Sequence, residues 1–137
     1  MDYLAVAIAG FLGAVTRAVL GNLLQTEHGS LFPVNTLFIN LTGCFILSFF
    51  MNLTISRFQI NPRWRLAFGT GFLGAYTTFS TFSVESINLM ISGHFLYSFI
   101  YILLTSLGCI GLAWLGVVLS KIVTDRHRDS VNPEETV

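Results

Sequence analysis

One short stretch of the chain combines hydroxyl groups with aromatic rings in a pattern suited to a small ion. Residues 74–85 read GAYTTFSTFSVE, and Phe79 and Phe82 stand three positions apart, so on a helix both rings project from one side. The hydroxyl residues around them are Thr77, Thr78, Ser80, Thr81 and Ser83. Ring edges are positive, so rings and hydroxyls together could replace the water around an anion without a fixed charge.

Other polar side chains interrupt apolar runs elsewhere in the chain. Arg17 and Glu85 are ionisable, and an ionised group at the centre of a bilayer costs about 2.5–3.5 kcal/mol on insertion scales. Two interpretations remain open. In the first, Arg17 reaches outward and Glu85 lies at the membrane interface. In the second, Arg17 faces a watery vestibule and raises the local concentration of anions. Asn40 and Thr105 are neutral polar residues within two further apolar runs.

The composition indicates that lipid surrounds most of the chain. Of 137 residues, 53% are hydrophobic and 10% charged, and the mean hydropathy is +0.72. A soluble domain carries about 25% charged residues. Phe95 to Ser120 contains no charge at all, and a helix needs about 20 apolar residues to cross a bilayer. Met1-Asp2 lacks the basic start of a signal peptide, so we expect the first apolar run to be retained as a span.

The apolar runs predict an all-α integral membrane protein with four spans. They cover residues 3–24, 34–53, 66–91 and 95–122. Turn residues such as Pro33, Asn61-Pro62 and Ser92-Gly93 separate them. Residues 1–122 are therefore expected to form one transmembrane domain, and the polar residues 123–137 a disordered cytoplasmic tail.

The basic residues predict how the chain is oriented. An even number of spans places both termini on one side, and the basic residues of that side are Arg57, Arg63, Arg65, Lys121, Arg126 and Arg128. The opposite loops, 25–33 and 92–94, contain no Lys or Arg. The positive-inside rule therefore predicts cytoplasmic termini.

Helical rise brings the polar residues to related depths. Phe79 lies about 20 Å from the inner end of its span, Asn40 about 20 Å from the inner end of its own, and Thr105 about 15 Å from the outer end. Gly69, Gly71 and Gly74 precede Phe79 and weaken the helix, so a break is expected there. Carbonyls freed at such a break can hold a small cation.

These segments resemble the CrcB/Fluc family of fluoride channels. The resemblance is carried by GTGFLGAYTTFSTFSVE at 69–85, GFLGAVTR at 10–17 and NTLFINLTGC at 35–44. It extends from about Ala9 to Gly116, and TTFSTFS is its most specific part. It implies passive efflux of cytoplasmic fluoride across the bacterial inner or plasma membrane, with no enzymatic activity and no nucleic-acid partner.

The resemblance also implies roles for individual residues. Phe79 and Phe82 match the pore phenylalanines and Asn40 the pore amide, with Thr78, Ser80 and Thr81 among the lining hydroxyls. Gly74 and Thr77 match the break whose carbonyls hold a structural sodium ion, while Arg17 and Glu85 match the arginine and the acid of the vestibule. The polar track of the fourth span falls at Tyr101, Thr105 and Cys109, where a thiol replaces the usual hydroxyl.

The family forms antiparallel dimers, which usually show little charge bias. The strong bias of this chain leaves two partners open: a second copy, or an oppositely oriented paralogue. Small residues at four-residue spacing, such as Gly10/Ala14 and Gly71/Ala75, suit either assembly.

Rival functions fit the residues less well. A small proton-coupled exporter needs a buried acid in its first span, where the only ionisable group is Arg17. A haem-binding bundle needs paired histidines at depth, but His28, His94 and His127 fall in loops or the tail. No nucleophile with a base can be assembled for an enzyme. An accessory membrane subunit remains an alternative, because fold does not fix function.

Overall fold

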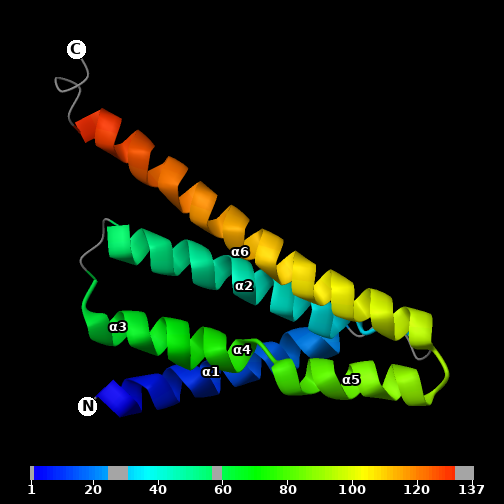
Figure 1. Cartoon of the computed structure of the whole chain (residues 1–137). Helices are drawn as coiled ribbons and strands as arrows, with labels where there is room; N and C mark the ends of the chain where they lie inside the picture. The colour runs from blue at the N-terminus through cyan, green and yellow to red at the C-terminus, as the bar shows by residue number, and fades with distance from the viewer. Residues whose placement is uncertain (1, 25–30, 57–59, 132–137) are drawn as a thin grey trace.

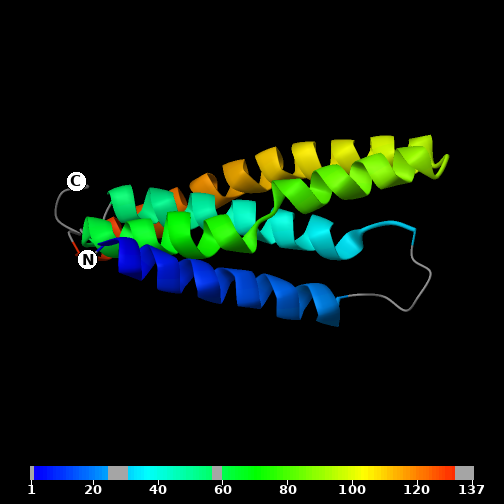
Figure 2. The same ribbon diagram turned by 90° about the horizontal axis from the view of Figure 1, so that it is seen from below.

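The computed structural model describes residues 2–24, 31–56 and 60–131, and every regular element in these ranges is a helix. The chain makes four passes, and consecutive passes run in opposite directions (Figure 1). The first and last described helices begin and end at the same side of the molecule, as the view turned by 90° also shows (Figure 2). The all-helical membrane class expected from the sequence is therefore confirmed.

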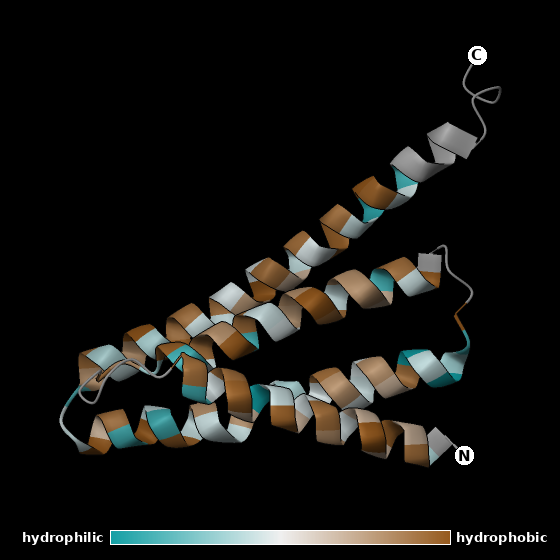
Figure 3. Cartoon of the chain, turned by 180° about the vertical axis from the view of Figure 1, so that it is seen from behind, coloured by the Kyte–Doolittle hydropathy of each residue, from teal (hydrophilic) through white to brown (hydrophobic). Residues whose placement is uncertain are grey.

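Three helices are long and apolar enough to cross a bilayer without interruption. They are α1 at Asp2–Leu23, α2 at Val34–Ser56 and α6 at Phe95–Val131. Large hydrophobic side chains are exposed on them, including Phe11 at 68% and Trp114 at 68%, and hydrophobic residues dominate the ribbon (Figure 3). Such exposure suits lipid, because the exposed side chains cost nothing in a hydrocarbon solvent.

The remaining pass is divided into four pieces. It comprises α3 at Pro62–Leu66, the π-helix η1 at Ala67–Leu73, α4 at Gly74–Tyr76 and α5 at Phe79–Ile91. Asn61 caps α3 by accepting the backbone N–H of Arg63, and Pro62 occupies the first turn, where no amide donor is needed. The chain leaves the helix at Thr77 and Thr78, both extended, and resumes at Phe79.

Gly74 was expected at this break, but it is helical, with φ −64° and ψ −32°. The two earlier glycines, Gly69 and Gly71, allow close packing against neighbouring helices. A Cβ on Gly71 would lie 2.8 Å from the carbonyl oxygen of Val6, so glycine allows α1 to approach η1. The helix therefore continues through the glycines and breaks after them, at Thr77 and Thr78.

The fourth pass is longer than expected. The tail was predicted to be disordered from residue 123, whereas α6 continues to Val131, and 132–137 lie outside the described residues. Extending an existing helix requires no new nucleus, so polar residues can prolong it beyond the apolar span.

Candidate functional site

The break in the third pass is held by a side chain from another helix. Asn40 of α2 donates from Nδ2 to the carbonyl oxygen of Thr78 at 3.0 Å and accepts the Thr78 backbone N–H on Oδ1 at 2.8 Å. Both residues are buried. A broken helix leaves such backbone groups without their usual partners, and at membrane depth water does not replace them. Asn40 therefore stabilises the extended conformation.

Thr78 also begins the helix that follows. Its Oγ1 accepts the backbone N–H of Thr81 at 3.2 Å and donates to Thr81 Oγ1 at 2.9 Å. The hydroxyl of Ser80 lies 3.3 Å from the same Oγ1. The predicted hydroxyls Thr78, Ser80 and Thr81 thus form one cluster at the N-terminus of α5.

The break also changes the surroundings of two carbonyl groups. In a continuous helix, the Gly74 carbonyl would accept the N–H of Thr78, and the Thr77 carbonyl that of Thr81. Here Thr78 N–H bonds to Asn40 and Thr81 N–H bonds to Thr78 Oγ1. The two carbonyls singled out from the sequence have therefore both lost their helical donors. A Cβ on the exposed Gly74 would meet nothing within 4 Å.

Helices α2 and α6 present matching polar stripes to each other. The two helices lie side by side and run in the same direction (Figure 1). Their stripes, at four-residue spacing, are Thr36, Asn40 and Cys44 on α2 and Tyr101, Thr105 and Cys109 on α6. Residues four apart share a face of a helix, so parallel helices bring the stripes level with each other.

An open groove of about 320 Å³ adjoins the break and is lined by two residues of each stripe, whereas Thr36 and Tyr101 lie outside its lining. Its lining includes Asn40, Cys44, Thr77, Thr78, Phe79, Phe82, Thr105 and Cys109. The centroids of the Phe79 and Phe82 rings are 5.8 Å apart with the ring planes tilted by 44°. Phe79 is 80% exposed, whereas Phe82 packs on the ring of Tyr101 at 5.2 Å. The groove therefore joins the polar stripes to the two rings predicted from the sequence.

The buried Thr105 hydroxyl beside this groove lacks a protein partner in the described part of the chain. Thr105 is 6% exposed, and among the described residues no group lies within hydrogen-bonding distance of its Oγ1. A buried hydroxyl without a partner is costly unless it meets water or a ligand. Thr105 Oγ1 is therefore a buried, unsatisfied hydroxyl on the α6 side of the groove.

The two predicted vestibule residues, Glu85 and Arg17, lie in different surroundings. Glu85 accepts the Thr36 hydroxyl on Oε1 at 2.9 Å and the Tyr101 hydroxyl on Oε2 at 2.8 Å. Its carboxylate thus joins α2, α5 and α6. Arg17 is partly exposed on α1, and the described residues lining the groove come from other elements.

The sequence interpretation missed Thr36, Ser86 and Ser98. Thr36 is buried and donates to Glu85, while the fully buried Ser98 donates to the carbonyl oxygen of Ser86 at 2.8 Å. A signal was present for Thr36, which stands four residues before Asn40 and hence on the same helix face. No sequence pattern indicated the Ser98 contact, because it joins two different helices, α5 and α6.

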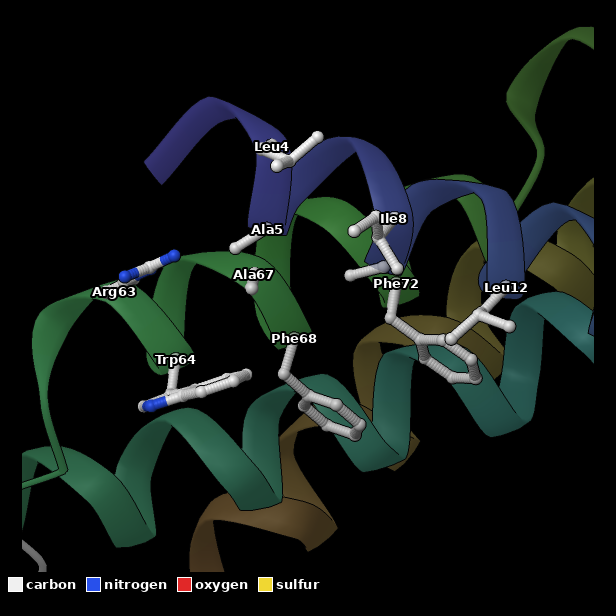
Figure 4. Close-up of a pocket in the computed structure, with 10 residues that line it drawn as sticks. Leu4, Ala5, Ile8, Leu12, Arg63, Trp64, Ala67, Phe68 and Phe72 are labelled. Carbon is white, nitrogen blue, oxygen red and sulfur yellow. The ribbon is translucent and has the colours of Figure 1, made fainter. Parts of the chain in front are cut away.

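A second groove, of about 400 Å³, lies between α1 and the α3–η1 segment (Figure 4). Leu4, Ile8 and Leu12 line it from α1, and the rings of Phe68 and Phe72 line it from η1. Its lining is apolar except near Arg63 and Trp64 at one end. Such a surface offers no donors to an ion along its length, so it differs in chemistry from the groove at the break.

The fold and the first groove together define a small four-pass membrane protein with a broken third helix whose break adjoins a polar groove. Comparison with known proteins agrees with this class. Residues 4–117 match the family described as CrcB-like protein, Camphor Resistance (CrcB). The chain therefore belongs to the CrcB family.

Several curated relatives carry a descriptive name. The protein "Fluoride-specific ion channel FluC" of Legionella pneumophila (strain Paris) is 38% identical over 128 residues, which is 93% of this chain and 96% of the relative. "Fluoride-specific ion channel FluC 2" of Carboxydothermus hydrogenoformans is 46% identical over 108 residues, 79% of this chain and 78% of the relative. A protein of the same name in Geobacillus kaustophilus is 44% identical over 121 residues, 88% of this chain and 94% of the relative.

Proposed function

We propose that the chain is a fluoride channel that lets cytoplasmic fluoride leave the cell passively. The relatives named above are called fluoride-specific channels and align with most of this chain. The observation that carries the proposal is the groove in which the Phe79 and Phe82 rings meet the polar stripe containing the unpartnered Thr105 hydroxyl. The chain is a channel subunit and not an enzyme.

The chemistry of the groove suits a compact, strongly hydrated anion. Such an ion gives up water only if many donors replace it, and Thr and Asn donate without a permanent charge. Asn40 uses one Nδ2 hydrogen for the Thr78 carbonyl, which leaves its second hydrogen for the groove that it lines. The Phe82 ring is fixed against Tyr101, so its edge is held in place. Weak, repeated contacts of this kind let an ion leave as well as enter.

Fluoride efflux from proteoliposomes tests the proposal. We expect flux without a proton gradient, and we expect Phe79→Ile and Phe82→Ile each to lower it by about tenfold or more, which equals a barrier increase of about 1.4 kcal/mol. Phe99→Ile on the exposed face of α6 is the matched control, because Phe99 is 59% exposed and lies outside the groove. Unchanged flux in both pore variants would remove the two rings from the mechanism, and flux that requires a proton gradient would favour an exporter.

We further propose that a sodium ion acts as a structural cofactor at the carbonyls of Gly74 and Thr77. Both carbonyls have lost their helical donors, and unwound backbone carbonyls are the ligands that transporters use for this ion. Two carbonyls from one chain are few for a cation, so a second chain would have to complete the shell. The open space around Gly74 supports this arrangement.

The second chain would be antiparallel, either another copy or an oppositely oriented paralogue. A two-fold axis in the membrane plane would bring two Gly74–Thr77 segments together and cover the exposed Phe79 ring. The charge bias of the loops supports cytoplasmic termini and one dominant orientation. The number in the name "FluC 2" of two relatives supports a paralogue as the partner.

A further inference from the structure

The two cysteines of the chain lie next to each other on the wall of the groove. Cys44 of α2 and Cys109 of α6 are both free, both partly exposed, and both line the groove of about 320 Å³. The matching positions of the two cysteines on parallel helices place their thiols at the same level of the α2–α6 interface. The sequence analysis placed Cys109 on the polar track of the fourth span, and the fold brings Cys44 to the same groove.

The register of the two helices explains why the thiols meet. Thr36 and Tyr101 lie level with each other, because both of their hydroxyls donate to the Glu85 carboxylate. Cys44 is eight residues after Thr36, and Cys109 is eight residues after Tyr101. Below the cysteines, a Cβ on Gly116 would lie 2.7 Å from the carbonyl oxygen of Phe45, so the two backbones approach closely there. The two helices are thus held together on both sides of the cysteines.

A site with two thiols and no further strong ligand suits one particular class of cation. Among the described residues no group of three or more His, Cys, Asp and Glu side chains could hold a metal ion. Zinc prefers four ligands, and calcium and magnesium prefer oxygen. Soft cations such as Cu⁺, Ag⁺ and Hg²⁺ prefer thiolates and accept linear coordination by two of them.

We propose that Cys44 and Cys109 together bind one thiophilic cation of this class between α2 and α6, and that the bound cation blocks the groove. With Hg²⁺ as the probe, each thiol loses a proton and each sulfur forms one bond to the metal, so two protons are released and no electron is transferred. Thr105, one turn before Cys109, lies beside the bound cation. The block of fluoride flux rests on the proposed function, whereas the binding does not.

Binding is tested on the purified full-length protein. Because the chain has 2 cysteines, mercuric chloride can reach no other thiol, and Cys44→Ala, Cys109→Ser and the double variant isolate each one. After mercuric chloride and a wash with a competing monothiol, the intact mass of the wild type should retain one mercury per chain, and a maleimide should label neither cysteine. Each single variant should lose its mercury in the wash, because a single thiol bond exchanges readily. Equal retention by the single variants, or two mercury atoms per wild-type chain, would overturn the shared site. Gel-filtration profiles matching the wild type establish that each variant is folded.

Flux is measured separately in proteoliposomes, with each variant compared with its own flux before mercury. We expect mercuric chloride to reduce wild-type fluoride efflux to the level of empty vesicles, a dithiol chelator to restore it, and the double variant to be insensitive. Unchanged efflux with mercury demonstrably bound would overturn the block. Absence of fluoride efflux before mercury would instead contradict the proposed function and leave the binding result to stand on its own.

Discussion

The hydroxyl groups of the broken helix divide between two kinds of partner. Thr77 donates to the Leu73 carbonyl at 3.0 Å and Ser83 to the Phe79 carbonyl at 2.9 Å, so both satisfy their own helix. Thr78 and Thr81 bond to each other. Thr105, contributed by α6, has a buried hydroxyl beside the groove with no partner in the described part of the chain. Several of the hydroxyls singled out from the sequence therefore stabilise the protein's own structure and are not available to an ion.

At the same scale, Asn40 carries the clearest prediction for stability. Asn40→Ala would leave the buried N–H and carbonyl of Thr78 unpaired, and each such group costs about 1–3 kcal/mol. We expect the free energy of unfolding in detergent micelles to fall by about 2–4 kcal/mol. Asn52→Ala is the graded control, because it removes one hydrogen bond, to Ser120 Oγ, and should cost about 1 kcal/mol. Equal losses in the two variants would contradict the role of Asn40 at the break.

At the scale of elements, glycine determines how closely the helices pack. Gly13 faces the backbone carbonyl of Phe72, and a Cβ there would overlap it, while Gly116 stands in the same relation to Ser48 and Phe45. One contact joins α1 to η1 and the other joins α2 to α6. These are the two interfaces that support the broken third pass and the polar stripes, so a shift at either would reach the groove.

Gly→Ala substitutions at two positions of one helix are therefore expected to change the free energy of unfolding in opposite directions, on α1 and again on α6. Gly13→Ala and Gly116→Ala should lower the free energy of unfolding by about 1–3 kcal/mol, because overlapping atoms force the helices apart. Gly21→Ala on α1 and Gly111→Ala on α6 meet nothing within 4 Å. They should be neutral or stabilising by up to about 1 kcal/mol, since alanine favours a helix. Thermal unfolding of the four variants decides this, and comparable losses at all four positions would count against close packing.

The sequence predicted the helices, which depend on residues near one another in the chain. It did not predict features that depend on contacts between helices far apart in the sequence. The apolar runs and turn residues predicted all four passes, and Asn61-Pro62 proved to be the start of α3. Of the two residues expected at the break, Thr77 lies there and Gly74 does not, and Asn40 from α2 bonds to the neighbouring Thr78. The Glu85 contacts and the thiol pair were likewise hidden, since both depend on the register of two helices far apart in sequence.

At the scale of the whole molecule, a single chain leaves the candidate pore open on one side. Phe79 is 80% exposed beside a groove that opens outward, and Gly74 faces empty space. An ion cannot cross hydrocarbon along such a surface, because its loss of hydration would be uncompensated. The second chain proposed above would close the groove, and its antiparallel arrangement requires that chain to be inserted the opposite way.

Charge reversal tests this requirement directly. A reversed copy carries glutamine at all six basic positions on the side of the termini together with Gln25→Lys and Ser92→Lys, which leaves lysines only in the opposite loops. The six positions are Arg57, Arg63, Arg65, Lys121, Arg126 and Arg128. Because the natural bias favours one orientation, we expect low fluoride efflux from cells expressing either copy alone and higher efflux when the two are expressed together. A second wild-type copy at the same total level is the control. A reporter that fluoresces only in the cytoplasm, fused to the C-terminus, should be bright on the natural chain and dark on the reversed one. If the natural chain alone matches the mixture, it inserts in both orientations and pairs with itself, so the paralogue would not be required.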